Sequence, residues 1–232
     1  MGSNDVVCTR LVRRQLNSIL PSSLRRRLAG ILYADIARYS HLTEEDEEGT
    51  HHRVIRAMEI MTAHIRGHRG RISHYAGDAV LAEFRDATSA LHCAIDVQAN
   101  IAACNAKITS DNRVEFRIGV NLGEIIADCG DIYGNAVNIA ARLESLADPG
   151  GICVSDAVRI NTSNRLPVSY VSMGEQWVKN ISSPVRAYRV GLEPPEDAGE
   201  KSMNVVQLRS EPVLEPKMGQ SVHKTYDRRS TD

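Results

Sequence analysis

Residues 71–84, Arg-Ile-Ser-His-Tyr-Ala-Gly-Asp-Ala-Val-Leu-Ala-Glu-Phe, decide the fold because they contain two short strand-like runs around a turn. The runs cover 71–75 and 79–84, and each has the length and composition of a β-strand. Gly77 and Asp78 lie between them, and both residue types favour tight turns. The stretch therefore predicts a β-hairpin that carries an acidic side chain in its turn.

A strand and a helix are predicted before this hairpin. The apolar run 28–35 predicts a buried strand that ends at Asp35. Thr43 and the acidic run 44–48 predict a helix start, because negative charge suits the positive end of the helix dipole. The helix should reach about residue 68, since four apolar residues recur at helical spacing: Val54, Met58, Met61 and Ile65.

A second helix and further strands are predicted after the hairpin. Residues 87–104 are rich in alanine and predict a helix, and a third helix is expected from about 135 to 147. The run 114–120 alternates as a strand does, and we expect 124–127 to pair with it. Later strands are predicted at three places: 152–154, 168–171 and 185–190. The order strand–helix–strand–strand–helix–strand predicts an α+β fold, a ferredoxin-like βαββαβ arrangement with extra C-terminal strands.

Composition divides the chain into three parts. Residues 1–27 contain six arginines and one acid, Asp5, and predict a basic extension that is either solvated or touches a membrane or a regulator. Residues 28–191 form the globular domain, and we expect the proline-rich, charged segment 192–232 to be a disordered tail.

Charge and hydropathy exclude several classes of protein. The formal net charge of −1 argues against a nucleic-acid binder, whose domains usually carry a strongly basic face. No apolar stretch approaches the roughly 20 residues of a membrane helix. The first 27 residues lack the apolar segment of a signal peptide, so we expect a cytoplasmic protein.

Two pairs of residues have the chemistry of a phosphate-processing site. Asp35 and Asp78 lie where apolar runs break, and paired carboxylates there can hold divalent cations. Asn138 and Arg142 share one helix face and can stabilise charge on a phosphorus centre. Taken alone, these residues could equally be turn acids and helix-surface groups, with Arg142 paired to a nearby acid such as Glu144 or Asp148.

Four segments together resemble the class III adenylate/guanylate cyclase domain, most closely its bacterial members with a single cyclase domain. The segments, in chain order, are YADIARYS (33–40), GDAVLAEF (77–84), DIYGNAVNIAARLE (131–144) and GEQWVKNI (174–181). Each motif is weak alone, but their order and spacing make the resemblance specific over about residues 28–190.

The resemblance implies an adenylate cyclase that converts ATP to 3′,5′-cyclic AMP and pyrophosphate. The ribose 3′-hydroxyl would attack the α-phosphorus with the help of two Mg²⁺ or Mn²⁺ ions. The implied roles, by residue, are metal binding by Asp35, Ile36 and Asp78, transition-state stabilisation by Asn138 and Arg142, base selection by His74 and Asp131, and triphosphate binding by Lys179.

The resemblance also implies a head-to-tail homodimer, because the metal aspartates come from one subunit and the base-selecting and transition-state residues from the other. The chain departs from the family at His74, where adenylate cyclases normally have lysine. A guanylate or relaxed-specificity cyclase therefore stays open, as does a catalytically silent homologue. A polymerase palm domain is disfavoured because it needs fingers-like and template-binding segments, for which a near-neutral chain of 232 residues leaves little room.

Ordinary structural roles for some of these residues also remain possible from the sequence. Asp131 could be an ordinary acid at a helix start, and Lys179 a solvated lysine near a strand. His64 and His68 lie four residues apart on a predicted helix, but no third ligand is evident, so the sequence alone disfavours a zinc site.

Overall fold

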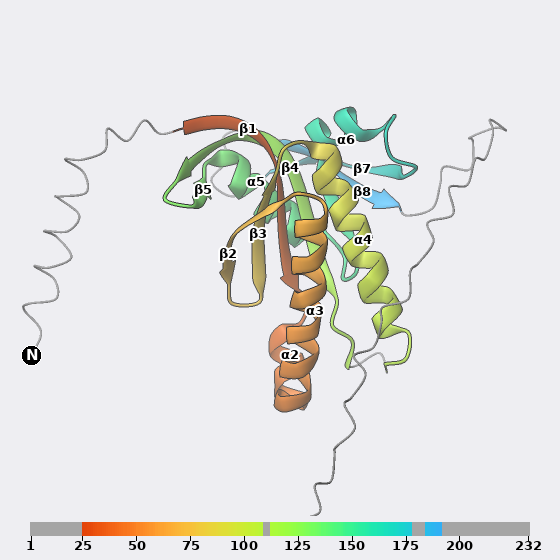
Figure 1. Cartoon of the computed structure of the whole chain (residues 1–232). Helices are drawn as coiled ribbons and strands as arrows, with labels where there is room; N and C mark the ends of the chain where they lie inside the picture. The colour runs from red at the N-terminus through yellow and green to blue at the C-terminus, as the bar shows by residue number, and fades with distance from the viewer. Residues whose placement is uncertain (1–24, 109–111, 178–183, 192–232) are drawn as a thin grey trace, which may run out of the picture. The chain divides into compact units, whose positions relative to one another are not determined.

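The computed structural model describes residues 25–108, 112–177 and 184–191 (Figure 1). The strands are β1 (Arg25–Ile36), β2 (Arg71–Ala76), β3 (Ala79–Phe84), β4 (Phe116–Asp128), β5 (Asp131–Tyr133), β6 (Ile152–Ser155), β7 (Ser169–Gln176) and β8 (Val185–Gly191). The helices are α2 (Tyr39–Glu45), α3 (Glu47–Gly67), α4 (Ala87–Asn105), α5 (Asn135–Leu146) and α6 (Asp156–Thr162). No helix in these ranges is long and apolar enough to cross a membrane.

In the described residues the strands form one mixed sheet in the order β2-β3-β1-β4-β6-β8-β7, with β5 paired to β4. The first four strands of this order, β2-β3-β1-β4, pair with one another in antiparallel fashion. Their chain order and neighbours are those of the ferredoxin-like βαββαβ unit, so the predicted fold class is confirmed. Strand β6 lies parallel to β4 and extends the sheet.

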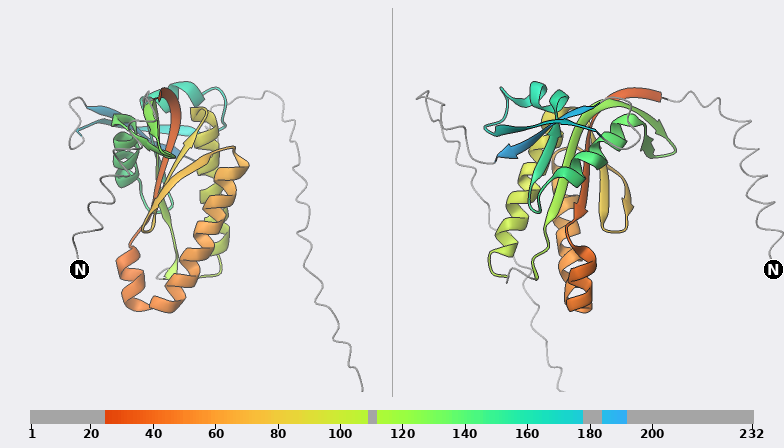
Figure 2. Two further views of the ribbon diagram at one scale, coloured as in Figure 1. Left: turned by 60° about the vertical axis from the view of Figure 1, so that its left-hand side comes forward. Right: turned by 180° about the vertical axis from the view of Figure 1, so that it is seen from behind.

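Helices cover both faces of the sheet (Figures 1 and 2). Alternate residues of β1 point to opposite faces, so Leu32 and Ala34 join the core beneath α3 and α4. Ile31 joins a second apolar cluster that includes Ala136 and Ala140 of α5. The side chain of Asp35 belongs to this second face by the same alternation.

Two glycines let α5 lie directly against β4. A Cβ atom added at Gly119 would be 2.1 Å from the carbonyl oxygen of Ala140, and one added at Gly123 would be 2.6 Å from the Cβ of Ala136. Between them, Asn121 donates a 2.9 Å hydrogen bond from Nδ2 to the carbonyl oxygen of Ala136. This close approach fixes which residues of α5 face the sheet.

The structure places one helix start later than the sequence predicts. Helix α3 begins at Glu47, and the carboxylate of Asp46 caps it by accepting a 2.9 Å hydrogen bond from the N–H of Gly49. Thr43 lies inside the short helix α2 instead, where its hydroxyl donates to the carbonyl oxygen of Tyr39. Each of several consecutive acids could cap the N-terminus of this helix, so composition alone could not identify Asp46 as the capping residue.

The prediction that 124–127 pairs with 114–120 is wrong. Both segments belong to the single strand β4, because its neighbour β1 is long enough to pair with it from Arg25 to Ile36. Residues 25–27, which the sequence assigns to the basic extension, are therefore part of the sheet. Residues 1–24 and 192–232 lie outside the described residues, so the predicted extension and tail stay predictions.

Candidate functional site

The hairpin brings the two predicted metal-binding aspartates together. Gly77 has a φ of 65°, which suits the first position of a two-residue turn, and Asp78 follows it. Val80 pairs with Ala34 in the β1–β3 register, so Asp78 lies beside the end of β1, where Asp35 is. Burial raises the pKa of Asp78, and the negative charge of Asp35 raises it further.

Ile36 has only a backbone role available at this site. Its side chain is buried in the core under α3 and α4 and carries no metal-binding atom. Its N–H donates a 3.0 Å hydrogen bond to Oδ1 of Asp35, which holds that carboxylate in place. A metal contact from this residue would have to come from its carbonyl oxygen.

An ion-pair network that the sequence did not predict supports Asp35. Arg117 lies directly opposite Asp35 in the β1–β4 register, and its Nη2 atom is 3.2 Å from Oδ2 of Asp35. On its other side, Nε of Arg117 lies 2.9 Å from Oε1 of Glu144, without the alignment of a hydrogen bond. Arg117 thus links a strand-end aspartate to a glutamate of α5.

Glu144 is the most buried acid of this group, with 4% of its surface exposed. Burial raises its pKa to about 6; the charges of Asp35 and Asp78 also raise it, while Arg117 opposes the shift. The pKa of Tyr33 is raised by burial and then by the same three acids. The negative charge of Asp35 thus raises the pKa of both Asp78 and Glu144, and a site of this kind would gain from a bound cation.

The two predicted base-selecting residues contact each other. Nδ1 of His74 lies 2.9 Å from Oδ1 of Asp131, and the hydroxyl of Ser73 donates to the same oxygen. The β2–β3 register shifts between Ile72 and His74, and this bulge lets two successive residues reach Asp131. Asp131 is therefore part of β5 and is bound to β2, which contradicts its alternative reading as an ordinary acid at a helix start.

Hydrogen bonding keeps Asp131 ionised. The pKa of Asp131 lies well below the usual range, and the hydrogen bond from Ser73 is the largest cause of this shift. Burial opposes the shift, and the hydrogen bond from His74 lowers the pKa further. Since an ionised carboxylate only accepts hydrogen bonds, Nδ1 of His74 must be the donor in this pair. The Nε2 atom is then the ring nitrogen left to meet a ligand.

Asn138 and Arg142 lie on the exposed side of α5, opposite its buried residues Ala136, Ala140 and Leu143. The alternative in which Arg142 pairs with a neighbouring acid does not hold. Glu144 is paired with Arg117, and Asp148 is paired with Arg189 at 3.0 Å. Within the described ranges no hydrogen bond or ion pair joins Asn138 or Arg142 to the aspartate pair. Lys179 lies outside the described residues.

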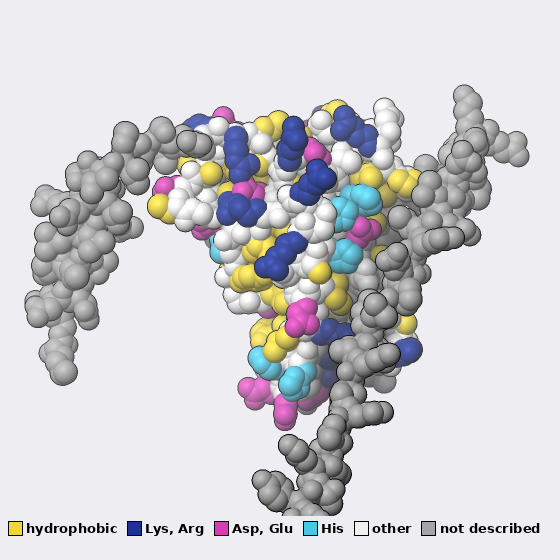
Figure 3. All heavy atoms as spheres, in the orientation of Figure 1, with side chains coloured by type: hydrophobic (Ala, Val, Ile, Leu, Met, Phe, Trp, Pro, Cys, Tyr) yellow, Lys and Arg dark blue, Asp and Glu magenta, His cyan; other side chains and the backbone are white. Residues whose placement is uncertain are grey.

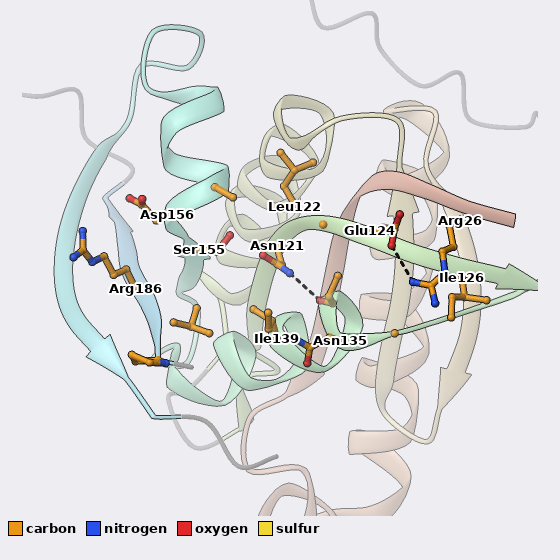
Figure 4. A pocket seen from close by; sticks show the side chains of 16 residues that line it. Arg26, Asn121, Leu122, Glu124, Ile126, Asn135, Ile139, Ser155, Asp156 and Arg186 are labelled. Atoms are coloured by element: carbon orange, nitrogen blue, oxygen red, sulfur yellow. Dashed lines mark hydrogen bonds and ion pairs between the residues drawn. The ribbon is translucent and has the colours of Figure 1, made fainter. Parts of the chain in front are cut away.

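A pocket of about 670 Å³ opens elsewhere in the domain (Figure 4). It is lined by residues of β4, α5, α6 and β8, among them Asn121, Asn135, Ile139, Asp156 and Arg186. None of the predicted metal, base or transition-state residues lines it. The predicted site therefore lies at the surface formed by the end of β1, the hairpin and β5.

A sequence model described as the adenylate and guanylate cyclase catalytic domain matches residues 24–188. The chain belongs to this family. A curated relative, putative adenylate cyclase 3 of Rhizobium meliloti, is 41% identical over 184 residues, which cover 77% of this chain and 31% of the relative. An adenylate cyclase of Streptomyces coelicolor is 31% identical over 133 residues, 57% of this chain and 33% of that protein. The chain thus spans about a third of the length of these relatives.

Solved structures of cyclases have the same fold as this domain. An adenylate/guanylate cyclase/hydrolase from Silicibacter pomeroyi superimposes with a TM-score of 0.66 at 39% identity, covering 72% of this chain and 98% of that structure. The adenylyl cyclase CyaB from P. aeruginosa gives a TM-score of 0.64 at 23% identity, covering 75% of this chain and 98% of that one, and shows the shared fold alone.

The residues of this cyclase domain fit the divalent cation that its family implies. Mg²⁺ and Mn²⁺ favour carboxylate and carbonyl oxygens, and Asp35, Asp78 and the Ile36 carbonyl are groups of that kind. Burial and then the charge of Asp35 raise the pKa of Asp78, which is the direction expected for paired carboxyl groups that could share a cation. Sequence reasoning missed Arg117 and the link of Glu144 to the aspartates. Glu144 ends the DIYGNAVNIAARLE motif, but no sequence spacing connects it to Arg117 or to Asp35.

Proposed function

We propose that the chain is an adenylate cyclase that converts ATP to 3′,5′-cyclic AMP and pyrophosphate at sites shared by a homodimer. Two observations carry this proposal: Asp35 and Asp78 meet, and His74 and Asp131 of the same chain form a hydrogen-bonded pair. One chain thereby offers an anionic cation site and a base-reading site. The names of the relatives as adenylate cyclases support the same activity.

The base would be read by Asp131 and His74. The ionised carboxylate of Asp131 can accept a hydrogen bond from the exocyclic amino group of adenine. Adenine N1 is an acceptor, so it needs a donor from Nε2 of His74. Because Nδ1 already donates to Asp131, Nε2 carries a proton only when the imidazole is cationic.

The same hydrogen bond is the reason to keep guanylate cyclase as a second candidate. A neutral His74 offers a lone pair at Nε2, which suits the N1–H donor of guanine. Asp131 argues against a strong GTP preference, because in the adenine pose it would face guanine O6, which is also an acceptor. The protonation of one imidazole would then shift the balance between ATP and GTP. Lysine at this position could only donate.

Cyclisation would depend on donors from the other subunit. Asn138 would orient the ribose, and Arg142 would stabilise the charge on the pentacoordinate phosphorus; losing one such fixed donor typically costs about 10²–10³ in rate. Two divalent cations held by Asp35, Asp78 and the Ile36 carbonyl would supply the activation of the 3′-hydroxyl and the neutralisation of the triphosphate. Lys179 would add a contact to the triphosphate.

The position of these groups on one chain supports a dimer. Asn138 and Arg142 lie on the exposed side of α5, whereas Asp35 lies against its buried side near Glu144. A second chain, turned head to tail, can present its exposed α5 residues to the aspartates of the first. Two such sites would form at one interface.

Turnover with Mn²⁺ and either ATP or GTP tests the proposed function. The wild type should form cyclic nucleotide, and Asp35→Ala should reduce the rate by at least about 100-fold. Glu175→Ala is the matched control, because Glu175 forms an exposed ion pair with Arg186 far along the sheet on β7. If the wild type makes no product with either nucleotide, the chain is a silent homologue. If Asp35→Ala is as active as Glu175→Ala, Asp35 does not hold the catalytic cation and the proposed mechanism is wrong.

A further inference from the structure

Four metal-binding side chains meet on the outer face of the helical layer, away from the aspartate pair. His64 lies in the last turn of α3 and His68, four residues later, caps the C-terminal end of that helix. His92 and Asp96 lie four residues apart on α4. Side chains at this spacing share one helix face. The two helices pack against each other, so the two pairs face one another. Figure 3 shows histidine side chains gathered around an acidic one on this face.

The distances within this His64–His68–Asp96 cluster suit a single ion. One ligand atom from each of its three residues lies within 4.8 Å of the other two. Nε2 of His68 is 2.7 Å from Oδ2 of Asp96, and Nε2 of His92 is 4.0 Å from the same oxygen. Tetrahedral zinc ligands at about 2.0–2.1 Å from the metal stand about 3.3 Å apart, which lies within this range.

The surroundings of the cluster favour a metal over a set of charged histidines. All three residues are half-buried, and burial lowers the pKa of His64, which keeps its ring neutral and able to coordinate. The side-chain amide of Asn100 lies 2.9 Å from Nε2 of His64. With its amide group flipped, Oδ1 of Asn100 would accept the Nε2–H of a metal-bound His64 and leave Nδ1 as the ligand atom. The rings of His68 and His92 have centroids 4.8 Å apart, so His92 is near enough to supply a fourth ligand.

The geometry points to a transition-metal site, of the Zn²⁺ class, formed by His64, His68 and Asp96 with His92 beside it. Imidazole and carboxylate ligands suit Zn²⁺, Ni²⁺ and Cu²⁺, whereas Mg²⁺ and Ca²⁺ favour oxygen alone. The bound ion would tie the C-terminal end of α3 to the middle of α4. The site is separate from the proposed cyclase chemistry and does not depend on it.

Zinc titration of the untagged full chain tests this proposal. Isothermal titration, combined with metal analysis after dialysis, should find one tightly bound Zn²⁺ per chain. The ion should remain in Asp35→Asn, which weakens the aspartate site. His64→Ala/His68→Ala should lower the affinity by at least about 100-fold, since losing even an outer-shell partner of a metal typically costs 10–100-fold.

Two further variants guard against a loss of fold and against unspecific binding by histidine. Asp96→Asn changes one partly exposed group on α4 and should lower the affinity at least about tenfold, with an unchanged circular dichroism spectrum. His51→Ala/His52→Ala removes two exposed histidines of α3 and should change nothing. The proposal is overturned if the wild type retains no zinc, or if Asp35→Asn abolishes binding while the three cluster substitutions leave it unchanged.

Discussion

Glu144→Gln is the substitution that most directly exposes the electrostatic cost of the acidic site. Glu144 is buried on α5 and faces the charges of Asp35 and Asp78. It forms an ion pair with Arg117 and accepts a 3.3 Å hydrogen bond from the hydroxyl of Ser145. Its pKa is raised from 4.5 to about 6. The folded protein therefore binds a proton here at pH values at which the unfolded chain has already released it.

The sign and size of the effect follow from linkage. A carboxyl group with a raised pKa in the folded state makes the protein less stable as pH rises through the interval between the two pKa values. Between pH 4.5 and 7.5, a shift from 4.5 to about 6 should cost about 1.5 kcal/mol of unfolding free energy. The raised pKa of Asp78 adds a contribution in the same direction. Glutamine keeps the shape of the side chain and does not titrate.

Urea unfolding at pH 4.5 and pH 7.5 measures this difference. We expect Glu144→Gln to gain about 1.5 kcal/mol relative to the wild type on going from the lower to the higher pH, whatever constant offset its altered packing causes. Glu175→Gln, which changes an exposed ion pair, is the control and should show no such gain. If Glu144→Gln and the wild type lose stability in parallel over this range, the charge of Glu144 is not the source of the cost.

Two further predictions test packing and base recognition. Gly119→Ala should destabilise the domain by about 1–3 kcal/mol in urea unfolding, because the added Cβ would collide with the backbone of α5. Gly67→Ala is the control and should be neutral or slightly stabilising, since no atom lies within 4 Å of its new Cβ. Equal effects of the two substitutions would contradict the close contact between α5 and β4. His74→Lys should raise kcat/KM for ATP about tenfold, as a charged donor to adenine N1 is worth ~1.5 kcal/mol or more. It should also raise the preference for ATP over GTP, because lysine can only donate to the base; an unchanged preference would argue against the side chain at position 74 meeting the base.

The local patterns predicted the elements well because each is set by nearby residues. The turn at Gly77 and Asp78 defines a hairpin by itself, and the alanine-rich stretch that became α4 has a helical composition throughout. The meeting of Asp35 with Asp78 was also predictable, since a βαββ order places the first strand beside the hairpin.

The supporting residues of the site could not be predicted, because they depend on register and on close packing. Arg117 meets Asp35 only because β1 and β4 pair along their whole length. Glu144 reaches Arg117 only because Gly119 lets α5 approach the strand. The contact between Asp131 and His74 passes through a bulge in β2, and the third ligand of the histidine cluster comes from another helix. None of these relations leaves a periodic signal in the sequence.

Mixing two inactive variants tests the central claim that the catalytic groups of one site come from two chains. Asp35→Ala lacks a metal-binding carboxylate and Arg142→Ala lacks the transition-state cation, so each homodimer has two broken sites. Equal mixing and re-association should give half heterodimers, each with one intact site, and hence about a quarter of wild-type activity. Activity that stays at the sum of the two separate variants, although native mass spectrometry shows heterodimers, would contradict the account.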